Sequence, residues 1–66
     1  MQLSRFMDCV QAEFGVNGSW ILDSHVLPAG ATAEELMRRG VPLREVWLAL
    51  CEDFEVPEAR RLGPDE

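Results

Sequence analysis

The sequence predicts an all-α protein, a small single-domain bundle of about four short helices. Apolar residues recur every three or four positions in several segments, as on one face of a helix, and no segment shows the two-residue alternation of a half-buried strand. The chain has 66 residues, which allows one small core. We therefore expect one helical domain over residues 1–62 and a flexible C-terminal tail at residues 63–66.

The first helix is expected near residues 4–14. Ser4 is a suitable N-cap, and Gly15 is a suitable residue to follow the last helical turn. The apolar side chains between these ends follow helical spacing and form one stripe: Leu3, Met7, Val10 and Phe14, widened by Phe6 and Cys9. This stripe is the face that we expect to meet the core.

The second helix is expected to start near Trp20 and to run to Leu27. Asn17-Gly18-Ser19 supplies turn residues and a cap directly before it. Its end is set by Pro28, because proline disfavours the α conformation at the preceding residue. Pro28-Ala29-Gly30-Ala31 then forms a short loop.

The third helix is short and is expected between Thr32 and Gly40. Thr32 and Glu35 match the capping box, in which each side chain satisfies the other residue's backbone N–H. Arg38 and Arg39 fall in the last turn, where a cation interacts favourably with the helix dipole. Gly40 closes the helix.

The most regular segment covers residues 42–54, with Pro42 expected at the first helical position. Its apolar face is the largest in the chain: Leu43, Val46, Trp47, Leu50, Cys51 and Phe54. Val56-Pro57 can start a last short turn, with Glu58 in its first turn and Arg60-Arg61 in its last.

The charge balance and the length narrow the classes of function. Twelve acidic residues stand against six basic ones, giving a net charge of −6 at pH 7. Sequence-independent DNA binding depends on many cations that neutralise phosphates, so this balance argues against direct nucleic-acid binding. So short a chain does not readily enclose a substrate cleft, and we therefore expect a protein that is not an enzyme.

The expected compartment is the cytoplasm. No apolar run approaches the roughly 18 residues of a membrane span, so no membrane association is expected. The first residues show no signal peptide pattern. Small secreted scaffolds usually carry four or more cysteines, whereas this chain has two, Cys9 and Cys51. Two buried thiols are therefore favoured over a disulfide.

His25 is the only histidine. It could act as a general base or, with Cys9, Cys51 and Asp23, as a metal ligand. Zinc sites usually contain close pairs such as Cys-x-x-Cys, and no such pair occurs here. A structural role is favoured, in which His25 bonds a backbone carbonyl or meets a helix C-terminus. We expect no catalytic residue, no metal site and no cofactor.

Two groups of residues are candidates for binding a partner protein. Trp20 lies in the first turn of its helix, where one face usually stays open, whereas Trp47 lies within the strongest apolar stripe and is expected in the core. Acidic residues also gather at the C-terminal end of the fourth helix, where their charge is mildly unfavourable beside the negative end of the helix dipole. Such a cluster suits docking onto a basic partner. A merely solubilising role is nevertheless favoured for these acids, with docking as the alternative: Glu52, Asp53, Glu55 and Glu58.

Three arginines, Arg38, Arg39 and Arg44, surround the turn between the third and fourth helices. A helix, a glycine turn and a second helix with arginines at the joint are also features of helix-turn-helix DNA readers. Glu45, Glu52 and Asp53 on the second of these helices would repel phosphates, so a solvated turn is favoured. A nucleic-acid-associated module remains the alternative function.

Several short motifs follow one another in a fixed order. They are Met1, Leu3 and Phe6 before Phe14-Gly15, His25-Val26-Leu27, a Thr32–Gly40 helix, Val46-Trp47-Leu48-Ala49-Leu50-Cys51 and Val56-Pro57. In order and spacing, over about residues 1–61, the chain resembles short actinobacterial proteins grouped as domain of unknown function 3046. Members usually carry an acid directly before the histidine, where this chain has Ser24, so a neighbouring acid–histidine pair is not carried over.

The resemblance implies a cytoplasmic, all-helical protein with no assigned activity and no catalytic residue. In many actinobacteria such genes lie close to those for the recombinase RecA and its regulator RecX, which by association suggests a role around recombination and DNA repair. Our leading hypothesis is an acidic protein-interaction or regulatory module. A homodimer is a further possibility, because a second copy often completes a small core.

Overall fold

The computed structural model describes residues 1–61, and its regular elements are helical. Four α-helices follow in order: α1 (Leu3–Phe14), α2 (Gly18–Ser24), α3 (Ala33–Arg38) and α4 (Leu43–Asp53). Two 3₁₀ turns complete the set: η1 (Gly15–Asn17) between α1 and α2, and η2 (Glu58–Arg60) after α4. The predicted all-α bundle is confirmed. The predicted tail at residues 63–66 lies outside the described residues.

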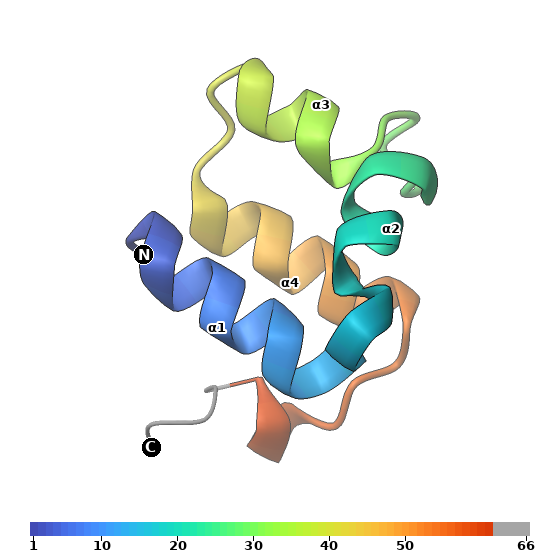
Figure 1. Cartoon of the computed structure of the whole chain (residues 1–66). Coiled ribbons are helices and arrows are strands. Elements are labelled where there is room, and N and C mark those ends of the chain that lie inside the picture. Colours follow the sequence, from blue (N-terminus) through green and yellow to red (C-terminus); the bar gives the residue numbers. More distant parts are fainter. Residues whose placement is uncertain (62–66) are drawn as a thin grey trace.

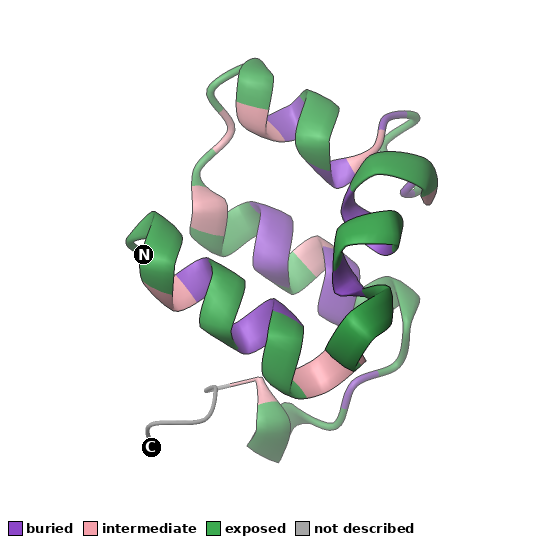
Figure 2. Ribbon diagram, viewed as in Figure 1, coloured by how far each residue is buried: buried purple, intermediate pink, exposed green. Residues whose placement is uncertain are grey.

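The longest helices, α1 and α4, lie side by side and run in the same direction (Figure 1). The intervening α2 and α3 lead the chain from the end of α1 back to the start of α4. All four helices contribute buried side chains (Figure 2). The largest fully buried side chains include Leu27, from the segment between α2 and α3, and the helical residues Trp47, Phe6, Leu50, Val10 and Val46. Among them, Trp47 was expected in the core and is only 2% exposed.

The predicted capping box at the start of α3 is present. The Thr32 hydroxyl accepts a hydrogen bond from the Glu35 amide at 3.2 Å, and the Glu35 carboxylate accepts one from the Thr32 amide at 3.3 Å. Gly40 follows α3 with φ 87°, a conformation that favours glycine. This short helix is therefore bounded by the two local signals that predicted it.

The prediction for the second helix is wrong at both ends. The helix starts at Gly18 and stops at Ser24. Beyond it, the Leu27 amide donates to the Ala31 carbonyl at 2.9 Å, and Val26 bridges to Thr32. These contacts close a tight turn that uses the backbone groups a longer helix would need, so the chain leaves the helix well before Pro28.

The starts of α1 and α4 also differ from the prediction. Gln2, rather than Ser4, is the N-cap of α1, and it makes no side-chain capping bond. Pro42 precedes α4 instead of occupying its first helical position, with an extended backbone (φ −54°, ψ 137°). Its carbonyl accepts the first helical hydrogen bond, from the Val46 amide at 3.1 Å. Pro42 therefore acts as an N-cap without a side-chain bond.

The predicted stripe of α1 is partly wrong. Phe6, Cys9 and Val10 are the buried residues of this helix, whereas Leu3 and Met7 are exposed. Helical spacing allows either side of the helix to face inward, and the observed packing turns the side with Phe6 and Cys9 toward the core. The rotation leaves apolar side chains of α1 on the protein surface.

Candidate functional site

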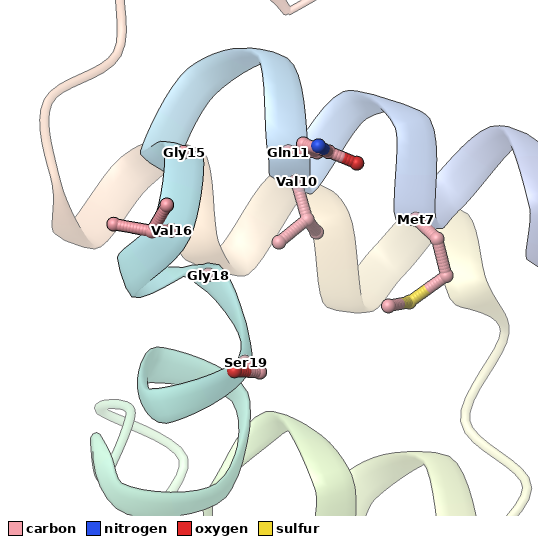
Figure 3. Close-up of a pocket in the computed structure, with 7 residues that line it drawn as sticks. All are labelled: Met7, Val10, Gln11, Gly15, Val16, Gly18 and Ser19. Atoms are coloured by element: carbon pink, nitrogen blue, oxygen red, sulfur yellow. The ribbon is translucent and has the colours of Figure 1, made fainter.

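A hollow of about 190 Å³ lies where α1 meets the start of α2. Its lining includes Met7, Val10 and Gln11 from α1, Val16 from η1 and Ser19 from α2 (Figure 3). Met7 and Val16 are exposed, and so is Trp20, which directly follows Ser19. We call the hollow together with Met7, Val16 and Trp20 the α1–α2 surface.

The close approach of α2 to α1 that forms this hollow depends on Gly18. A Cβ atom at this position would lie 2.8 Å from Cγ1 of the buried Val10. Such a distance is shorter than any ordinary van der Waals contact, so any larger residue would push α2 outward. Gly15, at φ 63°, supplies the turn in the chain just before it.

The two tryptophans lie in opposite environments. The indole of Trp20 is 64% exposed, and Val16, four residues earlier, is 96% exposed. The ring of Trp47 instead packs edge-on against Phe14, with centroids 6.3 Å apart. Trp20 is therefore a surface residue, and Trp47 is a core residue, as expected.

The structure divides the predicted acidic group. Asp53 pairs with His25, and Glu52 pairs with Arg61 at 3.2 Å. Glu55 is exposed and adopts a positive φ of 56° as the chain leaves α4. Glu58 opens η2 and lines a second hollow, between α1 and α4. The four acids thus do not form one uniform negative surface.

His25 lies at a corner that the sequence did not reveal. Its Nε2 atom pairs with the Asp53 carboxylate, and its ring packs on Phe54 with centroids 4.6 Å apart. The Phe54 ring in turn packs against the Phe14 ring, with centroids 5.1 Å apart. His25 is the C-cap residue of α2 and so lies at a helix C-terminus as expected, but its side chain pairs with Asp53 at the end of α4 instead of with a backbone carbonyl.

The three arginines of the alternative function lie on two helices. Arg38 pairs with Glu34 at 2.9 Å on the exposed side of α3, and Arg39 is the C-cap of the same helix. Arg44, in the first turn of α4, lines the hollow between α1 and α4 together with Arg5 and Arg61. The third arginine thus belongs to a different surface feature from the first two.

The C-terminal turn is fastened across both long helices. Arg60 makes two hydrogen bonds to the Glu13 carboxylate of α1, at 3.2 and 3.1 Å. The Arg61 guanidinium donates to the Val56 carbonyl at 3.0 Å, and its own carbonyl accepts from Trp47 Nε1 at 2.8 Å. Sequence reasoning missed this arrangement, because no local signal joins residues 13 and 60.

Both cysteines are buried and free. Burial raises the pKa of the Cys9 thiol above its ordinary value, and burial raises the pKa of Cys51 to about 11. A raised pKa keeps a thiol protonated and a poor nucleophile at neutral pH. Cys9 and Cys51 thus occupy core positions, as predicted.

Within residues 1–61, no three His, Cys, Asp or Glu side chains are grouped so as to hold a metal ion. None of the helices in this part of the chain has the length and apolar character that crossing a membrane requires.

The fold and the α1–α2 surface together define a small all-helical protein with exposed apolar side chains beside a shallow hollow. The chain belongs to the family described as protein of unknown function DUF3046, whose sequence profile matches residues 1–59. This match confirms the resemblance drawn from the motifs. Neither a curated protein nor a solved structure matches the chain.

Proposed function

We propose that the chain is a protein-interaction module that docks a partner protein through the α1–α2 surface. The observation that carries the proposal is the exposure of Val16, at 96%, which lines the hollow, and of Trp20, at 64%, which follows the lining residue Ser19 in the chain. Isolated apolar residues are common on protein surfaces, whereas several on or beside one hollow mark an interaction site. The proposed role is binding rather than catalysis.

The chemistry of the surface favours a protein partner over a small polar ligand. Tryptophan and methionine are enriched at the centres of protein interfaces, where an indole provides a large apolar area and one N–H donor. Gln11 and Ser19 at the edge of the hollow supply polar groups for hydrogen bonds. An apolar side chain of the partner would fill the hollow, while the exposed Trp20 would supply a further apolar contact.

We expect the same partner to carry a basic group that meets the acidic residues at the end of α4. Glu55 is exposed, and no described residue forms an ion pair with it. Asp53 and Glu52 are already paired within the chain, so their contribution to binding is smaller. The resemblance to a family whose genes often lie near those for RecA and RecX suggests the recombination machinery as the source of this partner.

Affinity capture from the native cytoplasm tests the proposal with a matched pair of variants. Trp20→Ala removes the anchor, and Val26→Ala truncates another exposed apolar residue outside the surface. Interface anchors typically contribute at least about 2 kcal/mol, which corresponds to an affinity loss of about 30-fold. We expect Trp20→Ala to lose a partner that the wild type and Val26→Ala retain. Equal recovery by all three proteins would contradict the proposal.

A further inference from the structure

The hollow between α1, α4 and η2 gathers positive charge in an acidic protein. Its volume is about 400 Å³, and its lining includes Arg5, Arg44, Arg61, Glu58, Met1 and Leu48. Three of the six arginines of the chain thus meet at one hollow with one of its twelve acids. We call this hollow the arginine groove.

The positions of the two long helices add to this charge. Arg5 lies in the first turn of α1, and Arg44 lies in the first turn of α4. Because these helices run in the same direction, their N-terminal ends lie at the same end of the bundle (Figure 1). The positive ends of two helix dipoles therefore reinforce the arginines.

The charges in the groove differ in their existing contacts. Arg61 is held by Glu52 and by the Val56 carbonyl, which fixes its guanidinium beside the groove. Arg44 forms no ion pair with any described residue. Arg44 can therefore bind an incoming carboxylate without first giving up a partner, which avoids a cost that ion pairs at interfaces usually carry.

The groove also has an apolar part. Met1, Leu48 and Trp47 line it; Met1 and Leu48 are exposed, and Trp47 is buried. An occupant that matches both parts carries carboxylates for the arginines and an aliphatic side chain for Leu48. A phosphate backbone supplies negative charge but no such aliphatic group.

We propose that the arginine groove binds an acidic peptide segment of a partner protein, with an aliphatic residue placed between its carboxylates. Glu58 is the one acid in the groove lining and opposes the occupant. The groove has no lining residue in common with the α1–α2 surface. It is therefore a second site, of opposite chemistry, and it does not rest on the function proposed above.

Fluorescence anisotropy with a labelled peptide of Asp, Glu and Leu residues tests the proposal at low salt. We expect saturable binding that Arg44→Glu weakens by about tenfold or more. Arg39→Glu is the matched control, because it changes the net charge equally at the exposed C-cap arginine of α3, which also lacks an ion pair among the described residues. Glu58→Gln is expected to tighten binding by about threefold.

Three outcomes would overturn this inference. Equal weakening by Arg44→Glu and Arg39→Glu would mean that only the overall charge matters. Equal affinity for a peptide with serine in place of leucine would show that the apolar part of the groove does not contribute to binding. Tighter binding of single-stranded DNA, with the same dependence on Arg44, would assign the groove to nucleic acid. Trp20→Ala is expected to leave peptide affinity unchanged, so this test and that of the proposed function fail independently.

Discussion

Trp47 Nε1 donates a hydrogen bond of 2.8 Å to the backbone carbonyl of Arg61, fourteen residues further along the chain. This bond connects the most buried aromatic residue of α4 to the C-terminal turn. Arg60 connects the same turn to Glu13 of α1. The turn therefore belongs to the folded structure and is bonded to both α1 and α4.

Trp47→Phe tests this connection. The variant keeps an aromatic ring in the core but removes the N–H group and part of the ring, leaving the Arg61 carbonyl without its donor. Loss of one such bond with some packing costs about 1–3 kcal/mol. We expect urea denaturation to show this loss and hydrogen exchange of residues 58–61 to accelerate. Trp20→Phe, on the exposed tryptophan, should change stability by less than about 0.5 kcal/mol. Equal effects at both positions would contradict the account.

Gly18→Ala tests the contact between α2 and α1. Alanine is favoured over glycine inside a helix by up to about 1 kcal/mol, and the Gly18 backbone is already helical. The new methyl group would nevertheless meet Val10 Cγ1 at 2.8 Å, and overpacking of this kind costs about 1–3 kcal/mol. We expect net destabilisation in thermal unfolding.

The companion variant is Val10→Ala, which removes the side chain that the new methyl group would meet. The double variant Gly18→Ala/Val10→Ala should lose clearly less stability than the sum of the losses in the two single variants. Strict additivity would show that the two residues are not coupled as the structure describes.

The pair between His25 and Asp53 is expected to make a small contribution to stability. Both side chains are about a third exposed or less, at 31% and 27%, so water competes with the interaction. A double-mutant cycle with His25→Ala and Asp53→Asn should give a coupling of about 0.2–1 kcal/mol. Asp23→Asn, at the only acid within α2, is the control and should show no coupling to Asp53→Asn. A coupling energy of zero between positions 25 and 53 would show that the two side chains do not stabilise the fold by interacting with each other.

We expect the folded protein to lose stability at alkaline pH, because its two thiols are buried. The unfolded chain ionises its thiols near their ordinary value of 9.0, whereas burial raises the pKa of Cys51 to about 11 in the folded protein. The free energy of unfolding is therefore unaffected by this group below pH 9 and decreases as the pH rises from 9 toward 11. Burial of Cys9 acts in the same direction.

Cys51→Ala should reduce this alkaline decrease, although it lowers stability at neutral pH by leaving a small cavity. Denaturant titrations of both proteins at several pH values between 8 and 11 measure the difference. Parallel pH profiles would contradict a buried, protonated Cys51. Modification of the native thiols at neutral pH should be slow, because it requires the chain to open.

Local signals in the sequence predicted the elements that depend on neighbouring residues. Thr32 and Glu35 are three positions apart, and their capping box could be expected from that spacing alone. The end of α2 could not, because it depends on Leu27 and Val26 bonding to Ala31 and Thr32 across a turn. A helix boundary decided by such pairing has no signature at the boundary itself.

The candidate sites show the same division. The exposure of Trp20 followed from its place in a first helical turn, whereas the exposure of Val16 and Met7 depended on how α1 rotates against α4. Likewise, Arg44 was expected beside Arg38 and Arg39, its neighbours along the chain. Its companions in the arginine groove are Arg5 and Arg61, which only the packing of α1, α4 and η2 brings to it.

The most direct test of the central claim is photo-crosslinking from the α1–α2 surface in the native cell. A photoreactive amino acid at position 16, where the valine is almost fully exposed, should form a covalent product with one protein partner. The same group at position 26, another exposed valine, is the control and should not yield that product. A partner captured from position 16, lost with Trp20→Ala and absent from position 26, is the predicted result. Identical products from both positions, or products that persist with Trp20→Ala, would contradict docking through this surface.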